Sequence, residues 1–237
     1  MQSKPFKNVI GSLMYAMIAT RPDICYAVGA LARFSANPGR VHWIAAKRIL
    51  RYLRGTMDLA LTFTHPRGKP LVFYGYSDSN WSGDPDTSRS TSGYVFMMGG
   101  AAIAWSSKLQ GMVALSSTEA EYIGLTAAAQ EIAWLRELMG EIGYKQSKPT
   151  LLLADNQGSI ALTKNPGYRS RTKHIARKFH YVREVVNERK WAVVDYCPTE
   201  EMLADILTKA LPREKHEKLT RGLGLVPRSS GSVRIHE

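Results

Sequence analysis

Residues 71–106 read LVFYGYSDSNWSGDPDTSRSTSGYVFMMGGAAIAWS, and this stretch decides the fold. Three runs rich in β-branched, aromatic and small apolar residues predict strands over Leu71–Ser77, Gly93–Met98 and Ala101–Ser106. Gly99 and Gly100, between the last two runs, are typical of a hairpin turn. We therefore expect three consecutive antiparallel strands, with Asp78 directly after the first.

The residues after this meander predict a helix and then strands of another kind. Residues 118–143 predict a long helix with Ser116, Ser117 or Thr118 as its N-cap. Thr150–Ala154 (TLLLA) is apolar throughout, which is typical of a strand buried on both faces. The remaining patterns predict helices over 156–164 and 172–190, a strand over Ala192–Cys197 and a helix over 200–210. This order, βββαβααβα, predicts an α/β fold with a mixed five-stranded sheet, three antiparallel strands followed by parallel ones, flanked by helices.

The first 60 residues predict helices and no strand. Apolar residues at helical spacing indicate one helix around Val9–Ile18, a second after Pro22 and a third over Val41–Leu53. The segment 64–70, THPRGKP, is rich in Pro and Gly and is the expected boundary. We therefore expect a small helical segment over 1–66, the α/β domain over 67–222, and a flexible, Gly- and Ser-rich tail over 223–237.

Composition and charge narrow the function. The chain has 237 residues, is 44% hydrophobic and carries a net charge of +12. Residues 1–66 and 164–190 each have nine Lys and Arg against two acidic residues, a net charge of +7 in each segment, which indicates surfaces for a polyanion such as nucleic acid.

No apolar run is long enough for a membrane span, and no secretory signal opens the chain, so we expect a cytoplasmic protein without a membrane partner. Two cysteines, Cys25 and Cys197, exclude a disulfide scaffold.

Acidic residues stand at the ends of the predicted elements. They are Asp78 after the first strand, Glu119 and Glu121 early in the long helix, Asp155 after the fourth strand and Asp205 in the last helix. The carboxyl ends of neighbouring parallel strands meet at one sheet edge, so Asp78 and Asp155 are expected to converge. Each acid taken alone also fits an N-cap, a turn or a solvated charge. Converging carboxylates favour Mg²⁺ or Mn²⁺, and two such ions suit phosphodiester hydrolysis. No zinc pair and no Gly-rich phosphate loop competes with this interpretation.

Six motifs also carry a family resemblance, over about residues 6–222. YSDSNW, GYVFMMGGAAIAWSSKLQ, SSTEAEY, LADNQGS, TKHIARKFHYVRE and LADILTKAL resemble the ribonuclease H domain of copia-type retrotransposon Pol polyproteins. The opening helical segment resembles the C-terminal tether of reverse transcriptase. The resemblance implies a ribonuclease H-like fold and cleavage of the RNA strand of RNA–DNA hybrids. It also implies a polyprotein that contains reverse transcriptase, assembled in cytoplasmic virus-like particles with access to the nucleus.

The resemblance also implies the roles of single residues. Asp78, Glu121, Asp155 and Asp205 match the catalytic, metal-ligating acids of a two-Mg²⁺ site, with Glu119 the alternative to Glu121. Gln157 matches a position that reads the minor groove. Weaker candidates for substrate contacts are Ser79, Ser116, Ser117 and Asn156. The residues expected to bind the phosphates of the substrate are Arg171, Lys173, His174, Arg177 and Lys178. The loop histidine of cellular relatives is missing before Asp205, where Glu200, Glu201 or His174 are possible substitutes.

Two other functions remain open at the level of sequence. One is a non-catalytic nucleic-acid-binding module with the same fold, kept for docking or left from a dead element. The other is a DNA-cutting or DNA-joining relative of integrase type, which usually ends its acidic set with Glu, whereas this chain ends it with Asp205.

Overall fold

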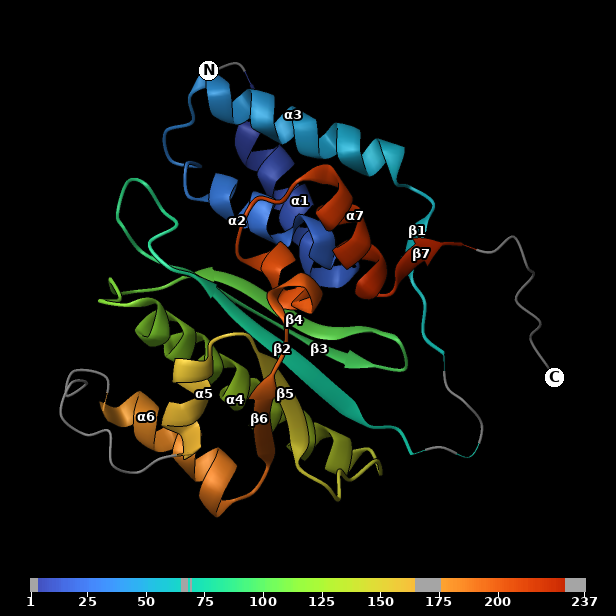
Figure 1. Ribbon diagram of the computed structural model, residues 1–237. Coiled ribbons are helices and arrows are strands. Elements are labelled where there is room, and N and C mark those ends of the chain that lie inside the picture. Colours follow the sequence, from blue (N-terminus) through green and yellow to red (C-terminus); the bar gives the residue numbers. More distant parts are fainter. Residues whose placement is uncertain (1–3, 65–67, 69, 165–175, 229–237) are drawn as a thin grey trace.

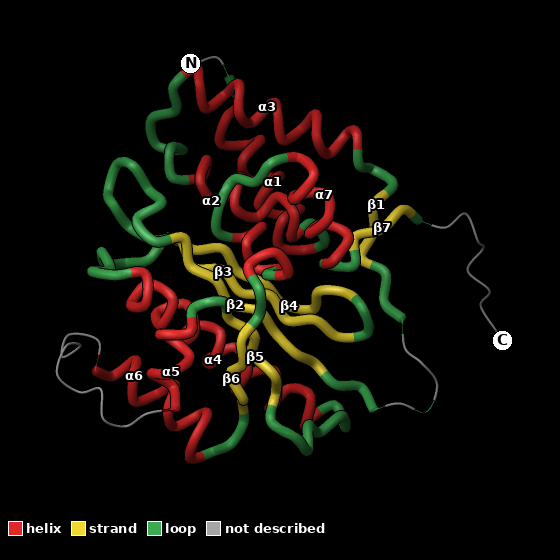
Figure 2. The backbone as a smooth tube through the Cα atoms, viewed as in Figure 1, coloured by secondary structure: helices red, strands yellow, loops and turns green. Residues whose placement is uncertain are grey.

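The computed structural model describes residues 4–64, 68, 70–164 and 176–228. Its centre is a mixed five-stranded sheet in the order β4-β3-β2-β5-β6 (Figure 2). The strands are β2 (Phe73–Asn80), β3 (Thr91–Met98), β4 (Ala101–Leu109), β5 (Thr150–Ala154) and β6 (Ala192–Tyr196). β2, β3 and β4 pair antiparallel, whereas β5 pairs parallel with β2 and with β6. The predicted α/β fold class and mixed sheet are confirmed.

The register of the central strands sets the positions of the acids. β2 and β5 pair with Gly75 opposite Leu152 and Tyr76 opposite Leu153. Two residues further along both strands, the same register leads to Asp78 and Asp155. Asp78 lies inside β2, paired with Gly93 of β3, and not after the strand as predicted. The strand continues because the polar residues after Tyr76 still find ladder partners on β3.

Helices α4 (Ser117–Glu141), α5 (Gln157–Lys164) and α6 (Ala176–Arg183) lie together on one side of the sheet (Figure 1). Ser116 caps α4, since its side chain accepts a hydrogen bond from the Glu119 amide. α6 continues into a short π-helical turn, Glu184–Glu188. The main core forms between these helices and the sheet, around Phe73, Phe96 and Tyr122.

The other side of the sheet carries the N-terminal helices and the C-terminal elements (Figure 1). Helices α1 (Phe6–Ala19), α2 (Cys25–Ala32) and α3 (Arg40–Gly55) confirm the predicted helical start and share a small core of their own. A second cluster joins them to the sheet, because Cys25 packs with Val95 and Met97 of β3 and with Leu207. The Trp105 indole of β4 also donates a hydrogen bond to the Met17 carbonyl, at 2.8 Å. The division into two domains stays a prediction.

Three C-terminal features differ from the expectations. Residues 200–210 form two 3₁₀ helices, η4 (Thr199–Glu201) and η5 (Leu203–Leu207), in place of one α-helix. An unpredicted helix, α7 (Arg213–Gly222), follows. Strand β7 (Leu225–Pro227) then pairs antiparallel with an equally unexpected strand, β1 (Leu59–Leu61), where a flexible tail was expected. Both strands are only three residues long, too short for a periodic signal. No helix in the described ranges combines the length and apolarity that a membrane crossing requires.

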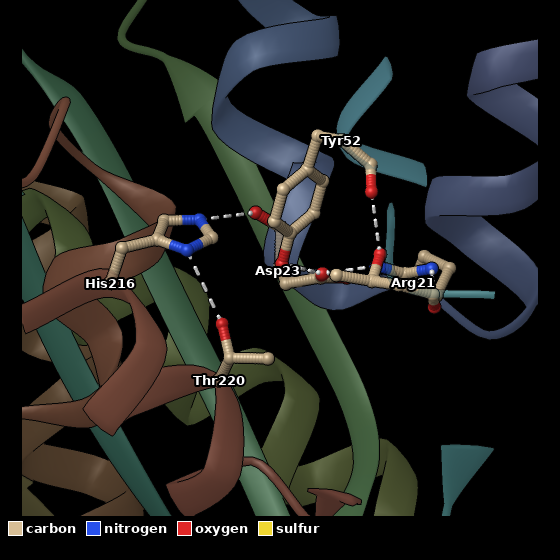
Figure 3. Close-up of polar contacts among 6 residues, drawn as sticks. Arg21, Asp23, Tyr52, His216 and Thr220 are labelled. Atoms are coloured by element: carbon tan, nitrogen blue, oxygen red, sulfur yellow. Dashed lines mark hydrogen bonds and ion pairs between the residues drawn. The ribbon is translucent and has the colours of Figure 1, made fainter. Parts of the chain in front are cut away.

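A buried polar network fixes the helical segment to α7 (Figure 3). The Arg21 guanidinium donates two hydrogen bonds to the Asp23 carboxylate, at 2.9 and 2.7 Å, and the Tyr52 hydroxyl of α3 donates a third, at 2.6 Å. His216 of α7 contacts the Asp23 carbonyl through Nε2, at 3.1 Å, and lies near Thr220 through Nδ1. The ion pair is almost fully buried, so each partner depends on the other to offset its desolvation.

We predict that Asp23→Ala lowers the free energy of unfolding by about 3–5 kcal/mol, because it leaves the buried Arg21 guanidinium without its carboxylate. Urea unfolding, followed by circular dichroism, measures the loss. The matched control is Arg213→Ala, which removes the exposed pair between Arg213 and Glu217. A control as unstable as Asp23→Ala would contradict the prediction.

Candidate metal centre

Three carboxylates converge at the ends of β2, α4 and β5. Asp78, Glu121 and Asp155 each offer an oxygen, and these oxygens lie within 4.8 Å of one another. The β2–β5 register brings the two aspartates together, and α4 brings the glutamate. α4 comes close because it carries Gly124 against β2: a Cβ there would lie 2.6 Å from the Ser79 hydroxyl. Asp78 and Glu121 are buried and Asp155 is half-buried.

The two glutamates of α4 point in different directions. The Glu121 Oε1 accepts a hydrogen bond from the Ser79 amide at the end of β2, at 3.1 Å. The Glu119 Oε2 instead accepts one from the Leu115 amide, at 2.9 Å, while Ser116 accepts from the Glu119 amide. The side chain and the amide of Glu119 thus both bond to the turn that precedes α4. Glu121 is therefore the glutamate of the cluster, and Glu119 closes the start of the helix.

Hydroxyl groups hold two of the cluster carboxylates. The Thr208 hydroxyl donates a hydrogen bond to the Asp78 Oδ2. The Thr199 hydroxyl, in η4, donates one to the Asp155 Oδ2, at 3.0 Å. The Glu121 Oε2 is buried and has no hydrogen-bond partner in the described part of the chain. Such an orphaned carboxylate oxygen is costly unless a cation compensates it.

Asp205 lies beside this cluster and is held by lysines. Its side chain is fully buried; Oδ1 lies 2.6 Å from the Lys209 ammonium, and Oδ2 lies 2.8 Å from the Lys215 ammonium. The Lys209 ammonium also lies 3.8 Å from the Asp78 Oδ2, so it bridges the two aspartates. The structure thus brings three of the four predicted acids together and leaves the fourth next to them in an ion-paired group.

Crowding and burial change the ionisation of the site. Burial raises the pKa of Asp78 to about 6; Lys209 and Thr208 counter this in part, while Asp205 and Asp155 add to it. Burial also raises the pKa of Glu121 well above its usual value, with further contributions from Asp78 and Asp155. For Lys209, burial lowers the pKa, but the neighbouring aspartates outweigh it and the net shift is upward. The carboxylates repel one another unless positive charge lies between them.

The donor set fits a divalent cation. All three ligands are carboxylate oxygens, which Mg²⁺ and Mn²⁺ prefer, and there is no nitrogen or sulfur ligand for zinc in this cluster. The orphaned Glu121 Oε2 supplies an independent sign that positive charge belongs there. The cluster is compatible with divalent metal binding.

The predicted substrate contacts have different surroundings. Gln157 is exposed at the start of α5, two residues after Asp155. Asn156 caps α5, since its Oδ1 accepts from the Ser159 amide at 2.8 Å. Ser79 is buried with its hydroxyl 3.0 Å from that of Ser92, whereas Ser116 and Ser117 are exposed.

Most of the residues predicted to bind phosphate lie outside the described part of the structure. Arg171, Lys173 and His174 lie outside the described residues. Arg177 and Lys178 belong to α6, but their side chains lie outside that part as well. Glu200 and Glu201, the suggested substitutes for the missing loop histidine, are exposed in η4 beside Thr199.

Sequence reasoning missed the groups that surround the carboxylates: Thr199, Thr208, Lys209 and Lys215. One signal was present, because LADILTKAL places a hydroxyl three residues and an ammonium four residues after Asp205. The contacts of Thr199 and Lys215 depend on how η4 and α7 fold back toward the sheet.

The raised pKa values predict a pH-dependent effect of Mg²⁺ on stability. Without a divalent cation, the folded state binds protons on Asp78 and Glu121 more tightly than the unfolded state. The contribution of Asp78 to stability is therefore full below about pH 4 and is lost as pH rises through about 6, on the order of 3 kcal/mol. The raised pKa of Glu121 acts in the same direction. Mg²⁺ should raise the melting temperature clearly at pH 8 and little at pH 4.5, as thermal shift assays can test. Asp78→Asn should weaken the pH dependence, and an equal Mg²⁺ effect at both pH values would contradict the prediction.

The bridging ammonium predicts competition with metal. Lys209→Gln removes a positive charge 3.8 Å from Asp78, so Mn²⁺ should bind roughly tenfold more tightly, about 1.4 kcal/mol. Isothermal titration with Mn²⁺ measures the change. Lys215→Gln, which removes an ammonium paired with Asp205 alone among the described carboxylates, should have a smaller effect. Weaker Mn²⁺ binding by Lys209→Gln would refute this.

Known proteins resemble this chain over most of its length. No family model matches it. It is 45% identical to the retrovirus-related Pol polyprotein of the Nicotiana tabacum transposon TNT 1-94 over 225 residues, 95% of this chain and 17% of that protein. The corresponding protein of the Arabidopsis thaliana transposon RE2 is 40% identical over 96% of this chain and 16% of that protein. The secreted RxLR effector protein 161 of Plasmopara viticola is 48% identical over 57% of this chain and 94% of its own length.

Among solved structures, an RNase H1 isolated from compost is 19% identical, with a TM-score of 0.45 over 62% of this chain and 96% of that one. The chain spans less than a fifth of the Pol polyproteins that it matches (17% and 16%). Identities of 40–45% over nearly all of its length show common descent. The chain is a homologue of the retrovirus-related Pol polyproteins of plant copia-type transposons.

Proposed function

We propose that this chain hydrolyses the RNA strand of RNA–DNA hybrids during reverse transcription of a retrotransposon. The observation that carries the proposal is the convergence of Asp78, Glu121 and Asp155 within 4.8 Å, with a buried, orphaned oxygen on Glu121. The homology to Pol polyproteins supplies a context in which such hybrids arise. The net charge of +12 suits a polyanionic substrate.

Asp78, Glu121 and Asp155 would hold divalent cations, with Asp205 as the fourth ligand of a two-ion site. Bound Mg²⁺ supplies positive charge for the phosphate oxygens and lowers the pKa of water at the site. Thr208 and Thr199 keep the Asp78 and Asp155 carboxylates in place through their hydrogen bonds. Lys209 balances the negative charge between Asp78 and Asp205.

Residues around the cluster would select the substrate. Gln157 is exposed two residues after Asp155 and can donate to or accept from a 2′-hydroxyl, the group that distinguishes RNA from DNA. Arg171, Lys173, His174, Arg177 and Lys178 would hold phosphates, with weaker contributions from Asn156, Ser79, Ser116 and Ser117. The reverse transcriptase part of the polyprotein is the proposed partner.

A binding module without catalysis is the second candidate. One observation favours it: Lys209 and Lys215 already neutralise Asp205, so the fourth ligand starts in an ion-paired state. Such a module would still bind hybrids through its basic surfaces. Measurements of binding and of cleavage on the same protein separate the two functions.

We predict that the chain cleaves the RNA strand of a labelled RNA–DNA hybrid with Mg²⁺, and that Asp155→Asn and Glu121→Gln abolish cleavage. Gel electrophoresis of the products measures the rates. Glu119→Gln is the matched control: it lies two residues from Glu121 but outside the cluster, its amide oxygen can still accept a hydrogen bond from the Leu115 amide, and it should retain cleavage.

Duplex DNA and duplex RNA complete the test. Hybrid binding without Mg²⁺-dependent cleavage would establish the binding module, and cleavage of duplex DNA would favour the integrase-type alternative. Equal cleavage by the parent and Asp155→Asn would overturn the metal-dependent mechanism.

A further inference from the structure

A cavity separates the helical segment from the C-terminal elements, next to the carboxylate cluster. It has a volume of about 790 Å³ and lies between α2 and α3 on one side and the η5–α7 region on the other. Its lining includes Lys209, whose ammonium lies 3.8 Å from the Asp78 carboxylate. Lys209 therefore connects the cavity lining with the proposed cleavage site.

The walls of this cavity are fixed relative to each other. Asp23, Tyr52 and His216 all line it, and the hydrogen bonds of Figure 3 join these residues to one another. The Tyr52 and His216 rings also meet edge to face, with centroids 5.4 Å apart. A ligand would therefore meet a preformed cavity.

The cavity carries unbalanced positive charge. α3 contains Arg40, Lys47, Arg48, Arg51 and Arg54, all exposed, and no acidic residue. Of these, Arg48 and Arg51 line the cavity, one helical turn apart, and neither has an ion-pair partner among the described residues.

The other charged groups of the lining already have partners. Asp23 is paired with Arg21, and Arg213 with Glu217. The remaining surface is mainly apolar, with Ile24, Leu31, Ile49 and Leu211 among its residues. An apolar surface together with two guanidinium groups that have no ion pair among the described residues suits a nucleic-acid strand, which carries phosphates together with sugars and bases.

We propose that this cavity binds the RNA strand as a single strand where it runs on from the hybrid held at the carboxylates. The proposal rests on the function proposed above, because the strand whose phosphate meets the carboxylates is the RNA strand. That strand continues past Lys209 into the cavity, where Arg48 and Arg51 contact its phosphates. The N-terminal helical segment thus forms part of the surface that binds the RNA strand. An acidic segment of the polyprotein is the other occupant that such charges could accept.

The experiment compares a short blunt RNA–DNA hybrid with the same hybrid carrying a single-stranded extension. The extension is RNA or DNA, at either end, and fluorescence anisotropy in EDTA measures binding without cleavage. For the parent protein, an RNA extension at one end should increase the affinity several-fold. The salt dependence of binding should steepen with it, by about 0.7 in log–log slope for each further phosphate that the protein neutralises.

The decisive variant is Arg48→Gln/Arg51→Gln. It should lose the affinity increase from the RNA extension and keep the affinity for the blunt hybrid. Its matched control is Lys47→Gln/Arg54→Gln, which removes the same charge from exposed positions of the same helix outside the cavity lining. The control should keep the increase. Circular dichroism and melting temperatures establish that both variants are folded.

The proposal would be overturned by equal losses in the two double variants, by no loss in Arg48→Gln/Arg51→Gln, or by the same affinity increase from a DNA extension. Absence of an increase from every extension would overturn it too, and would favour a protein segment as the occupant. The blunt hybrid separates this result from the function itself. If it is bound and cleaved with Mg²⁺, only the cavity proposal fails; if it is neither bound nor cleaved, the proposed function fails.

Discussion

The repulsion among carboxylates at the end of β2 is the constraint on which the rest of the site depends. Asp78, Glu121 and Asp155 crowd within 4.8 Å, and burial raises the pKa of the first two. An arrangement of this kind lowers the stability of the folded protein at neutral pH unless positive charge offsets it. A divalent cation is the natural counter-charge, and Lys209 supplies part of it from within the chain.

The C-terminal elements reach this site because the sheet leaves room for them. Gly93 of β3 stands opposite Asp78, and a Cβ there would lie 2.7 Å from Leu207 and 2.8 Å from Thr208. The absence of a side chain therefore lets η5 lie directly on the strand. Thr208 and Lys209 follow at once and contact Asp78. The same elements form one wall of the cavity that α3 faces, so the helical segment and the carboxylates share Lys209 as a neighbour.

Local sequence patterns predicted much of the fold but only part of the candidate site. The predicted strand Thr150–Ala154 has the observed bounds, and the polar start of α4 predicted its cap. Residues two apart on a helix diverge by about 200°, so Glu119 and Glu121 had to differ in role, but the sequence alone left their assignment to a resemblance. A hydrogen bond gives the physical reason: the Leu115 amide donates to the Glu119 carboxylate and holds it at the start of α4. Residues 200–210 were predicted as one helix, and a stretch this short does not distinguish an α-helix from successive 3₁₀ turns.

The sequence by itself predicted the five strands of the mixed sheet, the long helix and the four candidate acids, because hydrophobic periodicity and turn residues act locally. Tertiary structure alone decided that Asp205 is buried between two lysines, that β1 pairs with β7 and that Arg48, Arg51 and Lys209 line one cavity. These features join residues far apart in the chain, such as Leu59 and Pro227. Their contacts depend on how whole elements pack, and no short-range pattern encodes that.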